Sequence, residues 1–230
     1  MKPMVNRLLA ALSRAERGRL LANCDPVDLV MGTVLSEPGD RVDQVYFPID
    51  SFVSLLIPID GHPHLEVGLI GNEGMLGVCL AQGLDTSPLQ GLVQGAGPAW
   101  RMSAADLRRE LGRTPNLTRA LNRYVFVMLN QFAMVAACIR FHRVEARLAR
   151  WLLMTADRAH ADQFDITHEL LSQMLGVRRV GVTRAAGALR ERKLIRYYRG
   201  HVTILQRRGL EAASCACYGA ANRLYENVLG

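Results

Sequence analysis

The sequence of 230 residues has few of the features that mark secreted, membrane or disulfide-linked proteins. Its five cysteines are scattered along the chain, so no disulfide framework is expected. No uninterrupted apolar run reaches the roughly 18 residues of a membrane span, and the N-terminal segment is too polar to be a signal peptide. These absences predict a cytoplasmic protein without a membrane partner.

Sequence patterns that mark common enzyme sites are also missing. There is no nucleophile elbow, no phosphate-binding glycine loop and no paired histidine and acid at catalytic spacing. The pair Cys215 and Cys217 is a weak metal or redox signal, because two further ligands are not evident nearby in the sequence. We therefore expect no catalytic residues, no metal, no cofactor and no enzymatic activity.

Positive charge is concentrated in one half of the chain. Residues 1–113 carry a net charge of −3 and residues 114–230 a net charge of +10. Nearly all of the cations are arginines, which suit bidentate recognition of phosphate and guanine better than lysines do. The C-terminal half is therefore expected to meet a polyanion, while the N-terminal half has another task.

The segment 166–205 has the pattern of a winged helix-turn-helix. Thr167 is a good helix N-cap, and Gly176 supplies the conformational freedom of a sharp turn. Val177, Val182, Ala185 and Leu189 mark the buried side of the next helix, and 195–198 and 202–205 form the arms of a hairpin. The residues expected to face outward are Arg178, Arg179, Val180, Thr183 and Arg184. The plainer alternative is an ordinary helical hairpin with a solvated basic face.

Upstream of this segment the pattern is helical from residue 116 to about 160. Apolar residues recur in steps of three and four from Leu117 to Ile139, which predicts a seam along one side of a long helix. We interpret this seam as a dimer contact, although such a stripe could also pack within its own domain. The dimer residues predicted in it are Leu121, Tyr124, Met128, Phe132, Val135 and Ile139.

Short β-rich runs dominate the segment from about 30 to 102, which holds 11 of the 20 glycines and 6 of the 9 prolines. Strands are expected over 42–47, 52–57, 65–70 and 91–93, in a barrel or roll. Helices are expected over 4–22 and 209–228, and a linker over 160–163. The predicted fold class is α+β, with a β-roll over 1–115, a long dimerisation helix and connector over 116–160, and a winged helix-turn-helix with an extra C-terminal helix over 161–230.

This order of elements resembles the Crp–Fnr superfamily of bacterial transcription regulators. The resemblance rests on residues 32–40 and 45–55, which look like the first strands of the family's sensor roll, and on Ile166-Thr167 and 173–177 leading into Arg179 and Arg184. It implies that Arg179 and Arg184 contact bases, the second one commonly guanine. Val180 departs from the acidic residue of the cyclic-AMP receptor, and it can touch a thymine methyl group instead. Arg178, Arg199 and His201 are better placed for phosphates.

The sensor departs further from the family pattern. Val78 or Cys79 and Thr86 stand where the resemblance would place the ribose-binding glutamate and the phosphate-binding arginine of a cyclic-nucleotide cassette. A phosphate there would lack its charge-assisted partner. We therefore expect no tight binding of cyclic AMP. An effector pocket is predicted around Val78, Cys79, Thr86, Ser87 and Phe132.

These observations predict a homodimeric transcription regulator that binds a pseudo-palindromic site on double-stranded DNA. An unknown small-molecule effector is expected, and RNA polymerase is a further partner implied by the resemblance. Two alternatives stay open. The roll could be only a scaffold for a constitutive DNA-binding protein, or it could respond to a cyclic nucleotide through groups not recognised. The sequence does not indicate the operator, or whether the protein activates or represses.

Overall fold

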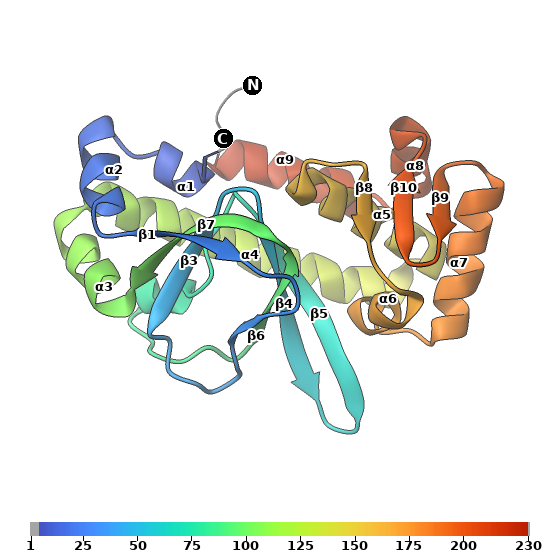
Figure 1. Ribbon diagram of the computed structural model, residues 1–230, viewed down its shortest axis with the longest axis horizontal. Coiled ribbons are helices and arrows are strands. Elements are labelled where there is room, and N and C mark those ends of the chain that lie inside the picture. The colour runs from blue at the N-terminus through green and yellow to red at the C-terminus, as the bar shows by residue number, and fades with distance from the viewer. Residues whose placement is uncertain (1–4, 230) are drawn as a thin grey trace. The chain divides into compact units, whose positions relative to one another are not determined.

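The computed structural model describes residues 5–229 (Figure 1). Among these, residues 5–57, 68–129 and 225–229 form one compact unit, and residues 58–67 and 130–224 form a second. The boundaries differ from the three predicted segments because the long helix and one hairpin each contribute to both units. Mixed helix and sheet confirm the α+β fold class.

The first unit is built on two antiparallel sheets. One sheet has the order β1-β7-β3 and the other the order β2-β6-β4-β5. Phe47, Leu69, Met75 and Met102 are fully buried in this unit. The strands are β1 (Asp25–Leu29), β2 (Val34–Ser36), β3 (Gln44–Pro48), β4 (Phe52–Ile59), β5 (His62–Ile70), β6 (Gln90–Gly95) and β7 (Gly97–Ser103). The four predicted strands are confirmed with small shifts, whereas β1, β2 and β7 were missed.

Two short helices replace the single N-terminal helix predicted over 4–22, of which Met4 lies outside the described residues. They are α1 (Arg7–Ala10) and α2 (Arg14–Leu21). A capping box formed by Ser13 and Glu16 starts the second of them. The Ser13 hydroxyl accepts a hydrogen bond from the Glu16 backbone N–H, and the Glu16 carboxylate accepts one from the Ser13 backbone N–H. The helix prediction was therefore wrong at Ser13, where a new helix starts.

Three helices connect the roll to the C-terminal elements: α3 (Ala104–Arg113), α4 (Pro115–Phe141) and α5 (Val144–Ala159). Ser103 caps α3, since its hydroxyl accepts a hydrogen bond from the Asp106 backbone at 3.0 Å. The helical pattern expected from 116 to 160 is confirmed, with a break between Phe141 and Val144.

The second unit contains a three-stranded sheet of order β8-β10-β9 beside several helices. Its further elements are β8 (Gln163–Asp165), α6 (His168–Leu175), α7 (Arg179–Glu191), β9 (Ile195–Tyr198), β10 (His201–Ile204), α8 (Arg207–Ala213) and α9 (Cys217–Leu229), whose last residues, 225–229, belong to the first unit. The predicted linker over 160–163 differs, because Gln163 pairs with Thr203 in the sheet. The helix expected over 209–228 is broken at Ser214, which takes an extended conformation.

Candidate functional site

The turn between α6 and α7 forms as the sequence predicts. The Thr167 hydroxyl accepts a hydrogen bond from the Leu170 backbone at 3.1 Å and caps α6. Gly176 ends the helix with φ of 59°, a left-handed conformation that a side chain rarely adopts. A Cβ there would also lie 2.7 Å from the Leu65 side chain, so the turn depends on glycine for space as well as conformation.

One side of α7 is buried and the other is exposed. Val182, Ala185 and Leu189 are buried as predicted, while Val177 is half-buried. This packing leaves the opposite side of the helix to solvent. The side chains predicted to face outward are all exposed, and we call them the α7 outer face: Arg178, Arg179, Val180, Thr183 and Arg184.

His168, the first residue of α6, contacts both α7 and the wing. This role was not predicted from the sequence. Its ring stacks on Tyr197 with the centroids 4.5 Å apart, and its Nδ1 lies 3.1 Å from the Thr183 hydroxyl. Burial lowers the pKa of His168, and the nearby charge of Arg179 lowers it further. The imidazole is therefore favoured in its neutral form, in which it fixes Thr183 on the α7 outer face.

The wing is a tight hairpin between β9 and β10, next to α7 (Figure 1). Arg199 and Gly200 both have positive φ, of 48° and 89°, which is the backbone of a type I′ turn. The Arg199 guanidinium lies 5.2 Å from the centre of the exposed Tyr198 ring. The His201 Nδ1 contacts the Asp165 carboxylate across the sheet, so this nitrogen is less available to a phosphate than the sequence suggests.

α5 holds this domain in place through buried polar contacts within the second unit. The Arg147 guanidinium donates to the carbonyl of Leu175 at the end of α6. The Trp151 indole donates to the Glu66 carboxylate at 2.8 Å, which connects α5 to the β4–β5 hairpin. Both contacts are buried, so the helix-turn-helix is anchored on one rigid helix.

The inner face of α4 corrects the predicted dimer seam. Leu121, Tyr124, Met128 and Val135 are buried within their own chain, Phe132 is half-buried, and Ile139 is exposed. A Cβ on Gly74 would lie 2.3 Å from the Tyr124 hydroxyl oxygen, which shows how closely this face packs against the roll. The apolar seam read from the sequence therefore packs mainly within the monomer.

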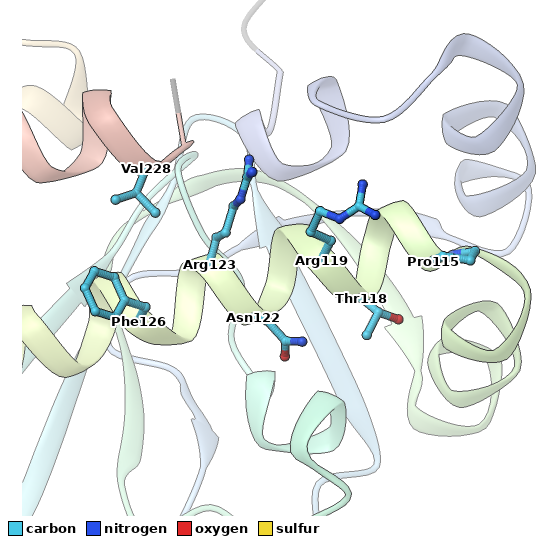
Figure 2. A pocket seen from close by; sticks show the side chains of 7 residues that line it. All are labelled: Pro115, Thr118, Arg119, Asn122, Arg123, Phe126 and Val228. Carbon is cyan, nitrogen blue, oxygen red and sulfur yellow. The ribbon is translucent and has the colours of Figure 1, made fainter.

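A second stripe of α4 is exposed, and we call it the α4 outer stripe: Phe126, Leu129, Ala133 and Ala136. Figure 2 shows its beginning at Phe126, beside a shallow hollow of about 500 Å³ that Arg119, Asn122 and Arg123 also line. The two arginines leave one side of α4, and Asn122 leaves the other. By length and composition alone α4 could also cross a membrane, and 33% of its most apolar window is buried. Asn130 and Gln131 interrupt α4, so the expectation that no uninterrupted apolar run reaches that length still stands.

The predicted effector residues differ in exposure and belong to two different units. Val78 and Cys79 are half-buried on a 3₁₀ helix (Val78–Gln82), and burial raises the pKa of the Cys79 thiol. Thr86 is exposed, and the Ser87 hydroxyl is bonded to the backbone of Leu89. These four lie in the first unit, whereas Phe132 belongs to the second.

A small cavity of about 210 Å³ lies beside this stretch, and Ser87 alone of the predicted effector residues lines it. Asp40, Arg41 and Asp43 also line it, and the Arg41 guanidinium is 3.6 Å from the Asp43 carboxylate. The cavity is smaller than the roughly 300–1,000 Å³ of typical ligand sites. With two carboxylates and one cation, it is poorly suited to an anionic nucleotide.

The structure also changes the interpretation of the Cys215 and Cys217 pair. Cys138 and His142, which are distant in the sequence, lie next to it in the second unit. The prediction that no further ligands lie near this pair was therefore wrong, because it considered only neighbours along the chain.

Comparison with known proteins agrees with this geometry. Residues 146–213 match the Crp-like helix-turn-helix domain, which covers α6, α7 and the wing. Over 178 residues the chain is 25% identical to the global nitrogen regulator of Nostoc sp. (strain PCC 7120), with 73% of this chain and 79% of the relative covered.

Solved structures show the same fold. The c-di-GMP responsive global regulator CLP of Xanthomonas campestris has a TM-score of 0.68 at 20% identity, covering 84% of this chain and 99% of its own. A transcriptional regulator of the Crp/Fnr family from Eubacterium rectale has a TM-score of 0.69 at 17% identity, covering 90% and 96%. The resemblance recognised in the sequence is confirmed.

Proposed function

We propose that this chain, a DNA-binding transcription regulator of the Crp/Fnr type, acts as a homodimer that reads a pseudo-palindromic operator with α7. The observation that carries this proposal is the α7 outer face, where five adjacent exposed side chains stand on a helix whose other side is buried. An α-helix presented in this way fits the major groove, where base edges can be distinguished.

The side chains of the α7 outer face and the wing suit two kinds of DNA contact, one to base edges and one to phosphates. Arg184, one turn after Val180, can donate two hydrogen bonds to guanine, and Val180 can contact a thymine methyl group. Arg178 precedes the helix and Arg199 stands at the tip of the wing, so both suit phosphate contacts. The net charge of +10 on residues 114–230 supports the same polyanionic partner.

The α4 outer stripe is the proposed dimer contact, in place of the seam predicted from the sequence. Its residues follow one another in steps of three and four, which places them on one line along the helix. Ala133 and Ala136 allow close approach of a second helix, and Phe126 and Leu129 supply apolar area. Pairing with a second copy of α4 would cover this stripe without a membrane, consistent with a cytoplasmic protein.

We propose further that the roll is an effector domain for a ligand less anionic than a cyclic nucleotide, as the charge of the small cavity suggests. The alternative is a constitutive DNA-binding protein in which the roll only supports the dimer. RNA polymerase is a proposed partner on the family resemblance alone. The resemblance implies that the segment 157–165 helps to contact RNA polymerase. Within it, Asp157 is already paired with Arg207 and accepts a hydrogen bond from the Tyr218 hydroxyl at 2.9 Å.

The base-reading role of Arg184 can be tested by substitution. Arg184→Ala should weaken binding to a cognate operator by about 1–3 kcal/mol and relax the preference at one base pair. Arg178→Ala is the matched control, because loss of a phosphate contact should weaken cognate and random DNA alike and reduce the salt dependence of binding. Fluorescence anisotropy on both DNAs measures this difference. Equal losses for Arg184→Ala on the two DNAs would contradict base reading.

A further inference from the structure

Four metal-ligating side chains gather in the second unit, away from the α7 outer face. The Sγ atoms of Cys138, Cys215 and Cys217 and a ring nitrogen of His142 all lie within 4.8 Å of one another. Cys138 Sγ is 3.5 Å from Cys215 Sγ, and Cys217 Sγ is 3.7 Å from His142 Nδ1. Cys138 and Cys215 are buried, and the other two are half-buried.

The backbone explains why these residues converge. Cys138 and His142 are four residues apart, so they occupy one side of the helix end, and His142 stands in the break between α4 and α5. Cys215 and Cys217 flank the start of α9, after Ser214 has interrupted the preceding helix. The extended backbone at Ser214 thus turns both thiols toward the end of α4.

The spacing fits one tetrahedral ion rather than a cluster of ions. Zinc–sulfur bonds of about 2.3 Å place neighbouring ligands of a tetrahedron roughly 3.8 Å apart. The Cys138–Cys215 and Cys217–His142 distances, 3.5 Å and 3.7 Å, are close to that edge. Ligands of an iron–sulfur cluster must span several iron atoms and would stand further apart than the 4.8 Å limit of this group.

The buried cations beside these four side chains favour a negatively charged centre. Arg147 and Arg150 are both buried, and within the described residues no carboxylate forms an ion pair with either of them. Among the described residues the Arg150 Nε has no hydrogen-bond partner, and the Arg150 Nη1 donates to the Met154 sulfur, at 3.3 Å.

We propose that Cys138, His142, Cys215 and Cys217 bind one Zn²⁺ ion in a closed structural site. Three cysteines would lose their thiol protons to solvent on binding, so Zn²⁺ and three thiolates would form a centre of net charge −1. That charge would offset one of the two positive charges of the buried Arg147 and Arg150. With four protein ligands no coordination position remains for a substrate, which indicates a structural role.

The site would fix the junction between α4 and α5 to the start of α9. α5 packs against α7 and α8 in the same unit, so the ion would stabilise the support of the helix-turn-helix. This inference does not depend on DNA binding, since metal content and stability can be measured without an operator.

The test uses the full-length chain purified under reducing conditions without chelator. Elemental analysis should find about one zinc per chain. Replacement by Co²⁺ should give the strong visible bands of tetrahedral cobalt with thiolate-to-metal charge transfer, and removal of the metal should lower the Tm by several degrees. His142→Gln and Cys217→Ser change half-exposed ligands, so both should fold. Each variant should bind Zn²⁺ more weakly than the wild type. The loss of affinity should exceed the roughly 10–100-fold that removal of an outer-shell partner causes.

Cys24→Ser and Cys79→Ser are the matched controls, because both cysteines lie outside the cluster. They should retain one zinc per chain and the cobalt spectrum of the wild type. Failure of the reduced wild-type chain to take up stoichiometric Zn²⁺ or Co²⁺ would overturn the proposal. So would a Cys138–Cys215 disulfide, found by mass spectrometry, whose reduction restores no metal binding.

Discussion

Single residues of the DNA-binding face were predictable where local pattern decides their environment. The period of α7 places the residues of the α7 outer face toward solvent, and Gly176 and Thr167 have conformations that short sequence rules describe. His168 was missed, because its stack on Tyr197 depends on a hairpin that starts 27 residues later. The cluster of Cys138 and Cys215 was missed for the same reason, since their contact spans 77 residues of sequence.

At this scale we predict that His168 makes the second unit less stable in acid. Its pKa in the folded state lies below the ordinary value of 6.5, so the unfolded state binds more protons just below that pH. The free energy of unfolding should therefore fall as the pH drops through and below 6.5, and His168→Gln should flatten this dependence. Urea unfolding followed by Trp151 fluorescence, in a Trp100→Phe background, measures it. Identical pH slopes in both proteins would contradict the prediction.

Among the elements, α4 is the one for which the sequence misled most. The helix has two apolar stripes, one buried against its own chain and one exposed, and both advance in steps of three and four. Hydrophobic periodicity cannot tell which stripe the monomer covers, because both fit a heptad pattern. The polar, short strands β1 and β2 were missed because pairing with neighbouring strands, not alternation, stabilises them.

The two stripes of α4 should respond differently to substitution. Leu129→Glu would place like charges opposite each other in a two-fold contact, so we expect a folded monomer with roughly 100-fold or more loss of operator affinity. Met128→Ala, the neighbouring buried position, should lower the free energy of unfolding by about 2–5 kcal/mol and leave the dimer intact. Light scattering and thermal unfolding distinguish the two. A dimeric Leu129→Glu protein would move the interface elsewhere.

For the whole molecule, the fold class and the order of roll, long helix and winged domain were predictable, because turn residues and periodicity agree along the chain. The division into two compact units was not, since the β4–β5 hairpin and α4 contribute to both. The effector pocket was not predictable either. The family resemblance selects the residues of the expected cassette by their position in the sequence. The walls of the cavity, however, come partly from the distant segment around Asp40 and Asp43.

At this scale we predict that cyclic AMP and cyclic GMP neither bind at micromolar concentrations nor alter operator affinity. The reason is that the small cavity presents Asp40 and Asp43 with Arg41 as their counter-charge, and an anionic phosphate would be repelled. Titration calorimetry with both nucleotides, together with operator binding in their presence, provides the measurement. Micromolar binding accompanied by a change in operator affinity would contradict this interpretation of the roll.

Selection of bound sequences from random double-stranded DNA by the purified full-length chain tests the central claim most directly. A homodimer that inserts α7 into the major groove should enrich a two-fold symmetric motif, with half-sites about one helical turn apart. Arg184→Ala should retain the spacing and lose discrimination at one position in each half-site. Enrichment of no motif, or of a motif without two-fold symmetry, would contradict the account.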